Sequence, residues 1–217
     1  MIRKPIQLKA AARQSLSGGW SSAAIFTLVY LLLYAFVPTF VVVYLFGEDS
    51  NFIQLIVSLA LIPFIWALWV MFLDVARTGN RCSVGFLFSG FNDYMRISGT
   101  LILQNVYIFL WTLLLIIPGI IKSLSYAMTP YILKDHPELS YDKAITRSSA
   151  MMKGHKMELF WLYLNFIGWI ILSIVTLGIA LLWVCPYLYT AFAHFYLDLK
   201  EEYEGGAKTV VQHNDDW

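Results

Sequence analysis

Lys122 is the residue whose position in this sequence most directly suggests chemistry, because its charge lies inside a long apolar block. A lysine in such a place needs a partner, a water-filled cavity or a route to the membrane interface. Two interpretations stay open. The side chain extends to the outer lipid headgroups, or it joins Ser123, Ser125 and Tyr126 in binding an anionic headgroup or solute at a broken helix.

A second set of charged residues follows in segment 134–156. Residues 140–154 are typical of an amphipathic helix, with Ser140 as its N-cap, Asp142 at its positive end and Gly154 as its stop. We expect this helix to lie on the inner membrane surface. One face carries Tyr141, Ile145, Ser148 and Met152, another carries Lys143, Arg147, Ala150 and Lys153, and Lys156 follows.

Two roles stay open for this basic segment. Lys143, Arg147, Lys153 and Lys156 can contact anionic lipid, or they can set the membrane orientation while the helix packs against the rest of the protein. The charge alone does not separate the two roles.

The remaining reactive side chains do not form a recognisable catalytic or metal site. His194 and Asp198 are four residues apart and share a helix face, but two ligands do not make a metal site, so we expect structural hydrogen bonds there. Cys82 and Cys185 are isolated. No GxSxG elbow, paired carboxylates or Gly-rich phosphate loop is present, so we expect no catalysis, no metal and no cofactor.

The composition predicts a membrane protein. Of 217 residues, 59% are hydrophobic and only 13% are charged, whereas soluble domains carry about 25% charged residues. The mean hydropathy is +0.65. A net charge of +1 argues against a nucleic-acid partner, which needs a concentrated basic surface.

The apolar blocks predict an all-α, polytopic helical bundle with about six transmembrane helices. The expected domain organisation is a basic N-terminal segment (1–20), a membrane domain (21–199) and a cytoplasmic tail (200–217). In the first segment, Leu8, Ala12 and Leu16 suit one face of a short interfacial helix, although a basic tail is the alternative. The expected spans are 20–46, 52–73, 98–117, 120–133, 157–176 and 179–199.

The third apolar block, residues 98–133, is too long for one span, and we expect a hairpin that turns at Pro118-Gly119. The return segment 120–133 is short, so a full crossing and a re-entrant segment both stay open. Basic residues in 1–20, 75–97 and 134–156 place these segments on one side, which requires an even number of crossings. Both termini are therefore expected to be cytoplasmic.

Several short motifs together resemble a family of bacterial integral membrane proteins of unknown function, family 975. The resemblance covers about Arg77 to Lys200 and more distantly extends to the membrane domain of some glycerophosphodiester phosphodiesterases, without their catalytic domain. It implies a six-helix membrane protein with no established activity. The motifs include Phe88–Phe91, Ile117–Ile121, Ser125–Leu133, Ala144–Ser148, Met152–His155, Phe166–Trp169, Thr176–Ile179 and Pro186-Tyr187.

These observations predict a bacterial inner-membrane protein that is a non-catalytic, lipid-contacting scaffold or accessory in envelope homeostasis. The alternative is a small transporter or permease for a lipid or an anionic solute. The expected partners are membrane lipids, with a second copy of the chain or other membrane proteins as further partners.

Overall fold

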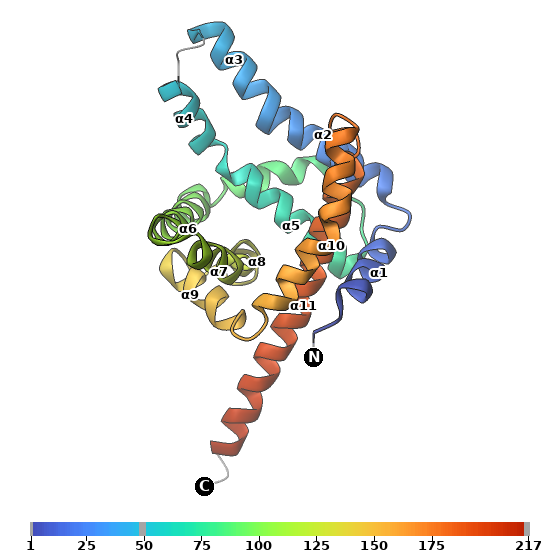
Figure 1. Cartoon of the computed structure of the whole chain (residues 1–217), viewed down its shortest axis with the longest axis vertical. Helices are drawn as coiled ribbons and strands as arrows, with labels where there is room; N and C mark the ends of the chain where they lie inside the picture. Colours follow the sequence, from blue (N-terminus) through green and yellow to red (C-terminus); the bar gives the residue numbers. More distant parts are fainter. Residues whose placement is uncertain (1, 48–50, 215–217) are drawn as a thin grey trace.

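The computed structural model describes residues 2–47 and 51–214, and the secondary structure of these residues is entirely helical (Figure 1). In chain order the elements are α1 (Pro5–Ser15), α2 (Trp20–Leu31), the π-helix η1 (Leu32–Phe36), α3 (Val37–Phe46), α4 (Asn51–Ala60), α5 (Ile62–Thr78), the 3₁₀-helix η2 (Val84–Phe91), α6 (Tyr94–Leu114), α7 (Ile116–Tyr126), α8 (Thr129–Asp135), α9 (Asp142–Met151), α10 (Lys156–Val175) and α11 (Leu181–Asn214).

The core forms where α5 and α11 pack side by side. Phe72 of α5 and Phe192 of α11 are almost fully buried, and the ring of Trp69 stacks on Phe192 with centroids 6.0 Å apart. Large aromatic side chains contribute much of the apolar contact area in such a core. These two helices form the frame against which the other elements are placed.

The N-terminal segment forms a helix that packs into this core. Leu8, Ala12 and Leu16 are buried, and α1 contacts α11, α5 and α10. Gly18 then adopts a left-handed conformation with φ of 81°, which glycine allows without steric cost. The apolar face expected at the membrane interface is therefore covered by the protein itself.

Proline interrupts the first two apolar blocks, as expected. The π-helix η1 precedes Pro38, whose ring would clash with the carbonyl of Tyr34 in a regular α-helix. In the second block the chain breaks at Leu61, and Pro63 lies in the first turn of α5. The loop from 79 to 93 contains η2, where Leu87 is buried and Phe88 and Phe91 pack against Phe64.

The helix break predicted at Pro118-Gly119 is wrong in position. The chain turns at Leu115, which has an extended backbone, and both Pro118 and Gly119 lie inside α7. Pro118 fits there because the first turn of a helix leaves its N–H groups without intrahelical partners. A Cβ atom on Gly119 would lie only 2.2 Å from Thr112 Oγ1 of α6. The glycine therefore serves the close approach of α6 and α7 rather than the turn.

Three helical segments are long and apolar enough to cross a membrane. They are Asn51–Thr78, which is α4 and α5 taken together, Tyr94–Leu114 (α6) and Lys156–Val175 (α10). A fourth candidate is the pair Pro5–Ser15 and Trp20–Tyr34, which is bent by 97°. The six predicted spans thus reduce to three or four candidates within the described residues. In α11 many side chains are buried inside the protein, including Phe192, Phe195 and Tyr196.

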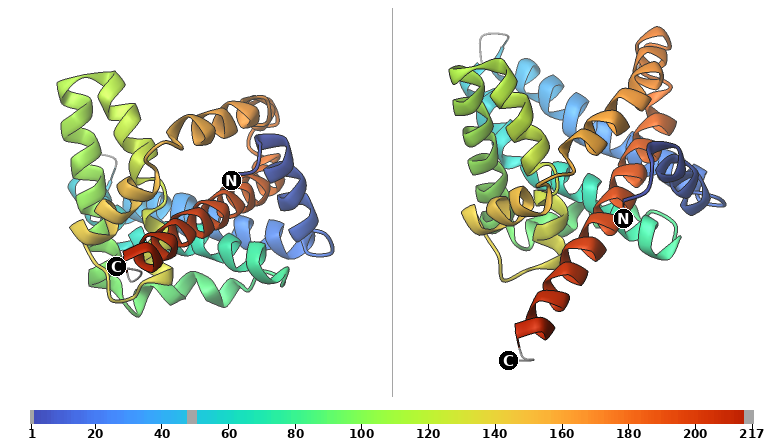
Figure 2. Two further views of the ribbon diagram at one scale, coloured as in Figure 1. Left: turned by 90° about the horizontal axis from the view of Figure 1, so that it is seen from below. Right: turned by 60° about the horizontal axis from the view of Figure 1, so that its bottom comes forward.

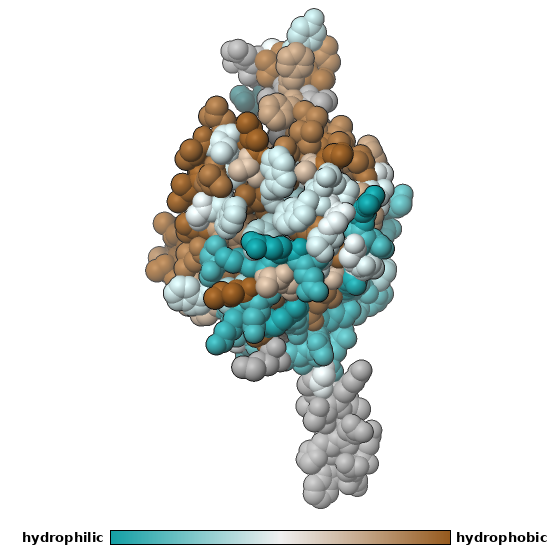
Figure 3. All heavy atoms as spheres, turned by 90° about the vertical axis from the view of Figure 1, so that its right-hand side faces the viewer, coloured by the Kyte–Doolittle hydropathy of each residue, from teal (hydrophilic) through white to brown (hydrophobic). Residues whose placement is uncertain are grey.

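The apolar helices form antiparallel pairs whose axes differ in direction, because α6 and α7 are seen end-on in Figure 1 while α10 and α11 run along the length of the molecule. In the right-hand view of Figure 2, the end of α3, the α6–α7 turn and the α10–α11 turn all lie at the upper end, while α11 extends downward. The face drawn in Figure 3 is mostly hydrophobic above and carries a hydrophilic band below. The structure therefore separates an apolar part from a polar part along one axis.

Two predicted boundaries near the polar end shift. Helix α9 begins at Asp142 after Tyr141, whose φ is 49°, so Ser140 is not its N-cap. Three residues of its predicted apolar face, Ile145, Ser148 and Met152, are buried, whereas Tyr141 precedes the helix and is exposed. The predicted tail boundary at residue 200 falls inside α11, which continues to Asn214, and residues 215–217 of that tail lie outside the described residues.

Candidate functional site

The ammonium group of Lys122 lies between two aromatic rings. Its Nζ is 4.8 Å from the ring centroid of Trp111 and 5.7 Å from that of Tyr126. Rings at this distance attract a cation through their electron-rich faces. The adjacent helices α6 and α7 thus supply part of the environment that a lysine in an apolar segment requires.

Lys122 also lines a pocket of about 400 Å³ between α6, α7 and α9. Two lysines, Lys122 and Lys153, and one carboxylate, Asp142, lie in its wall. The hydroxyl groups of Tyr107, Thr146 and Ser149 add hydrogen-bonding capacity. The full lining is Tyr107, Lys122, Tyr126, Asp142, Ile145, Thr146, Ser149, Ala150 and Lys153.

The carboxylate of this pocket already has partners. The hydroxyl of Tyr107 donates to Asp142 Oδ1 at 3.2 Å, and that of Thr146 donates to Asp142 Oδ2 at 3.5 Å. These hydrogen bonds stabilise the negative charge of Asp142, and the two ammonium groups outweigh it, so the pocket keeps a net positive charge. Two lysines with the hydroxyl of Ser149 nearby suit an anionic group such as a phosphate or a carboxylate.

Helix α9 is held in place by Ser148. Its hydroxyl donates to the carbonyl of Ser125 at 2.9 Å and accepts a hydrogen bond from the backbone N–H of Met128 at 3.2 Å. A second attachment is the backbone N–H of Tyr141, which donates to Thr100 Oγ1 at 2.7 Å. These bonds connect α9 to α6 and to the break between α7 and α8, and so fix one wall of the pocket.

Not every predicted residue reaches the pocket. Ser125 is buried, and its hydroxyl donates to the backbone carbonyl of Ile121, so its side chain belongs to the helix interior. Ser123 lines a different cavity. Lys122 and Tyr126 from one predicted set and Lys153 from the other are the residues that the structure brings together.

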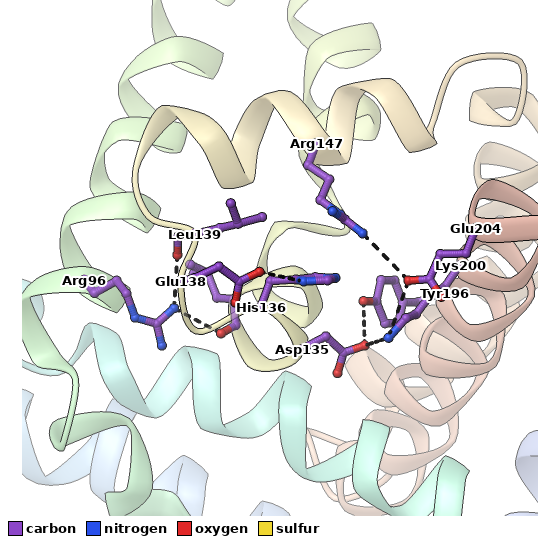
Figure 4. A network of polar contacts seen from close by, with 10 residues as sticks. Arg96, Asp135, His136, Glu138, Leu139, Arg147, Tyr196, Lys200 and Glu204 are labelled. Atoms are coloured by element: carbon purple, nitrogen blue, oxygen red, sulfur yellow. Dashed lines mark hydrogen bonds and ion pairs between the residues drawn. The ribbon is translucent and has the colours of Figure 1, made fainter. Parts of the chain in front are cut away.

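The other basic residues of segment 134–156 have different surroundings. Lys143 is exposed on α9, and Lys156 is half-buried at the start of α10. Arg147 points toward α11, where its Nη2 lies 3.7 Å from Glu204 Oε1 (Figure 4). Arg147 therefore takes part in a contact between helices within the protein.

A network of charged groups fastens the polar ends of several helices. Asp135, whose side chain is only 4% exposed, forms ion pairs with Arg77 at 2.6 Å and with Lys200 at 2.7 Å. It also accepts a hydrogen bond from the hydroxyl of Tyr196 at 2.9 Å. Figure 4 shows Asp135 facing Tyr196 and Lys200 of α11, with Arg96 holding the loop after α8 through Leu139.

The network changes the acidity of Asp135. Burial on its own raises the pKa of this carboxyl, but the hydrogen bonds from Arg77, Lys200 and Tyr196 outweigh burial and lower the pKa to about 2. Asp135 is therefore a permanent negative charge at ordinary pH. Its role is to join α5, α8 and α11.

His194 and Asp198 have separate structural partners, in line with the expected hydrogen bonds. Nε2 of His194 lies 2.9 Å from the hydroxyl of Ser15, and Asp198 pairs with Arg3. Among the described residues, no group of three or more His, Cys, Asp or Glu side chains could hold a metal ion.

Sequence reasoning missed Tyr107, Ser149 and the carboxylate role of Asp142 in the pocket. Tyr107 and Asp142 are 35 residues apart, and no local pattern joins a residue within an apolar span to a cap of a surface helix. The signal that could have pointed to Asp142 is its acidic side chain among the basic residues of α9.

Comparison with known proteins finds one family. Residues 106–203 match the family described as Protein of unknown function (DUF975). No curated protein and no solved structure matches the chain. The matched segment runs from α6 to α11 and contains all the residues lining the Lys122 pocket, so this part of the chain is similar to a family whose function is unknown.

Proposed function

We propose that this protein is a non-catalytic, multi-pass protein of the bacterial inner membrane that binds anionic lipid at the Lys122 pocket and acts as a scaffold or accessory in envelope homeostasis. The single observation that carries the proposal is that Lys122 of an apolar hairpin and Lys153 beyond α9 line one pocket. Their positive charges suit a lipid phosphate, and the apolar surface of α6 and α7 suits the acyl chains.

The arrangement of the helices supports this membrane placement. In the right-hand view of Figure 2, the end of α3, the α6–α7 turn and the α10–α11 turn lie on one side, away from the C-terminal end of α11. The charged network of Asp135 lies toward the opposite end of α11. Such an arrangement suits a chain that enters the bilayer three times from the cytoplasm and has both termini there.

The exposed apolar side chains support contact with lipid. Leu113, Leu114, Ile116 and Ile117 near the α6–α7 turn are each more than 69% exposed. A soluble surface seldom carries so large a contiguous apolar patch. Acyl chains are the surroundings in which this patch is stable.

Lys122→Ala tests the lipid site. Native mass spectrometry of the purified full chain is expected to detect bound dioleoylphosphatidylglycerol in preference to dioleoylphosphatidylcholine. The variant should bind the anionic lipid roughly tenfold more weakly, as loss of one charge-assisted hydrogen bond implies. Lys143→Ala is the matched control, because it removes the same charge from the exposed surface of α9 and should keep wild-type binding. Equal affinity of the wild type for both lipids, or equal loss in both variants, would refute the site.

The second candidate function is a small transporter or permease for a lipid or an anionic solute. A cavity of about 530 Å³ between α5, α6, α7 and α10 favours it, since transporters bind their substrates between helices. In proteoliposomes, flux of a labelled lipid that is lost in Ile108→Trp, which fills this cavity, would favour transport over scaffolding.

A further inference from the structure

The cavity between α5, α6, α7 and α10 differs in chemistry from the Lys122 pocket. It is partly enclosed and has a volume of about 530 Å³, within the range of roughly 300–1,000 Å³ that is typical of small-molecule sites. Its walls are mainly apolar and aromatic. The lining residues are Ile62, Ile65, Trp69, Leu101, Gln104, Asn105, Ile108, Ile120, Ser123, Leu124, Ala127, Pro130, Phe160 and Tyr163.

No charged side chain is present among these lining residues. The polar groups are the amides of Gln104 and Asn105 and the hydroxyls of Ser123 and Tyr163. Burying an ionised group in such surroundings without a countercharge is very costly. The cavity therefore suits an uncharged ligand.

Gln104 shows which hydrogen-bonding group the ligand needs. Its Oε1 atom is buried and has no hydrogen-bond partner among the described residues. The neighbouring Asn105 uses its Nδ2 group to donate to the carbonyl of Leu101 at 2.8 Å. A buried amide oxygen without a donor costs about 1–3 kcal/mol. A rotation of the Gln104 side chain that lets a ligand hydroxyl or N–H donate to Oε1 would remove this cost.

The cavity has a polar end and an apolar end. The polar end faces Arg96 and Lys156. Gln104 lies eight residues beyond Arg96 on α6, which corresponds to about 12 Å along the helix, and Phe160 lies near Lys156 at the start of α10. Ile108 and Ile120 lie closer to the α6–α7 turn. A ligand with a polar head and an apolar body fits this gradient.

The exterior beside the cavity decides how such a ligand enters. Ile120 of the cavity wall is 50% exposed, and Asn105 is also exposed, so the wall reaches the outer surface. Ile102 and Phe109 of α6 and Ile121 of α7 are further exposed apolar residues on the same two helices. This surface favours entry from the bilayer over entry from water.

We propose that the cavity between α5, α6, α7 and α10 binds an uncharged, hydroxyl-bearing lipid of the diacylglycerol kind, whose hydroxyl donates to Gln104 Oε1. Its acyl chains lie against Ile108, Ile120 and the aromatic ring of Trp69. Lys122 and Ser123 are neighbours in sequence but line different pockets. The neutral-lipid site is therefore separate from the anionic-lipid site.

Photocrosslinking of the full chain tests this proposal. The probe is a dioleoylglycerol analogue with a diazirine in one acyl chain, and the labelled residues are located by mass spectrometry. Labelling is expected on α6, α7 and α10, with competition by unlabelled dioleoylglycerol but not by dioleoylphosphatidylglycerol. Gln104→Leu should reduce the labelling roughly three- to tenfold, as expected for one lost hydrogen bond. Ile108→Trp, which fills the cavity, should abolish it.

Two controls keep the result interpretable. Asn165→Leu removes an amide from the exposed face of α10, where Asn165 also donates to a backbone carbonyl, and it should leave labelling unchanged. Lys122→Ala should likewise leave it unchanged while weakening anionic-lipid binding, so that each site can fail independently. Absence of labelling in the wild type, which would mean that water alone fills the cavity, would overturn the proposal. Equal labelling of wild type, Gln104→Leu and Ile108→Trp would do the same.

Discussion

Asp135 is the carboxylate on which the polar end of the molecule depends. Its partners Arg77, Tyr196 and Lys200 come from α5 and α11, while Asp135 itself ends α8. A buried carboxylate with this number of donors is well compensated, whereas removing its charge takes the close partner from Arg77 and leaves Lys200 only the more distant Glu204, at 3.9 Å. The residue is structural, and its contribution can be measured separately from lipid binding.

Asp135→Asn should lower the free energy of unfolding by about 1.5–3 kcal/mol, the usual effect of losing hydrogen bonds to a charged group. The measurement is thermal or chemical unfolding of the purified protein followed by circular dichroism. Glu138→Gln is the matched control, because the side chain of Glu138 is 65% exposed, and it should change stability little.

The pH dependence of this effect follows from the lowered pKa. The pKa of Asp135 is about 2 in the folded protein, against 3.8 for an unperturbed group. The stabilisation by its charge is therefore fully present above pH 3.8 and is lost as the pH falls toward 2. Wild type and Asp135→Asn should differ in stability by the same amount from pH 7 to pH 5 and converge at lower pH. A constant difference down to pH 2 would contradict the assigned pKa.

At the scale of elements, the pairing of α6 and α7 depends on Gly119. Its missing side chain lets α6 approach, because a Cβ atom would lie 2.8 Å from Thr112 Cα. Gly119→Ala should destabilise the protein by about 1–3 kcal/mol through overpacking. Gly168→Ala on the exposed face of α10 is the control, since nothing lies within 4 Å of its added Cβ. Alanine there should be neutral or slightly stabilising, because it favours helix formation.

The position of α9 indicates how deeply the α6–α7 hairpin enters the membrane. Tyr107 of α6 donates to Asp142 at the start of α9, so the basic helix lies beside the middle of the hairpin. From Tyr107 to the turn at Leu115 the helix rises by about 12 Å, whereas the hydrocarbon core is about 30 Å thick. Under the proposed placement of α9 at the cytoplasmic interface, the hairpin would end inside the bilayer. This geometry favours the re-entrant alternative for segment 120–133.

At the scale of the whole molecule, this arrangement predicts which sites reach each side of the membrane. In a protein with Cys82 and Cys185 replaced by alanine, single cysteines are placed at Asn51, Leu115 and Lys143. A membrane-impermeant maleimide should label Asn51→Cys in intact bacterial cells and Lys143→Cys only after permeabilisation. Leu115→Cys should react poorly in both conditions. Strong labelling of Leu115→Cys from outside would show instead that α6 and α7 cross fully.

The sequence by itself determined the class of the protein. Three local signals were sufficient, because each acts over a few helical turns. Long apolar blocks predicted helices, and the prolines at residues 38 and 63 predicted breaks. The spacing of Ile145, Ser148 and Met152 predicted a buried face of α9. They also identified Lys122 and Lys153, because a charge in an apolar segment or on an amphipathic helix is recognisable locally.

Only the tertiary structure decided how these elements meet. The turn lies at Leu115, because close packing of Gly119 on Thr112 keeps Pro118-Gly119 within α7. The network of Asp135 joins Arg77 of α5 and Lys200 of α11, which are distant in the chain, and no local period encodes such contacts. Burial in particular depends on which helix covers a side chain. This is why α1 packs into the protein, although its sequence predicted an interfacial helix or a basic tail, and why much of α11 is buried, although residues 179–199 predicted a membrane span.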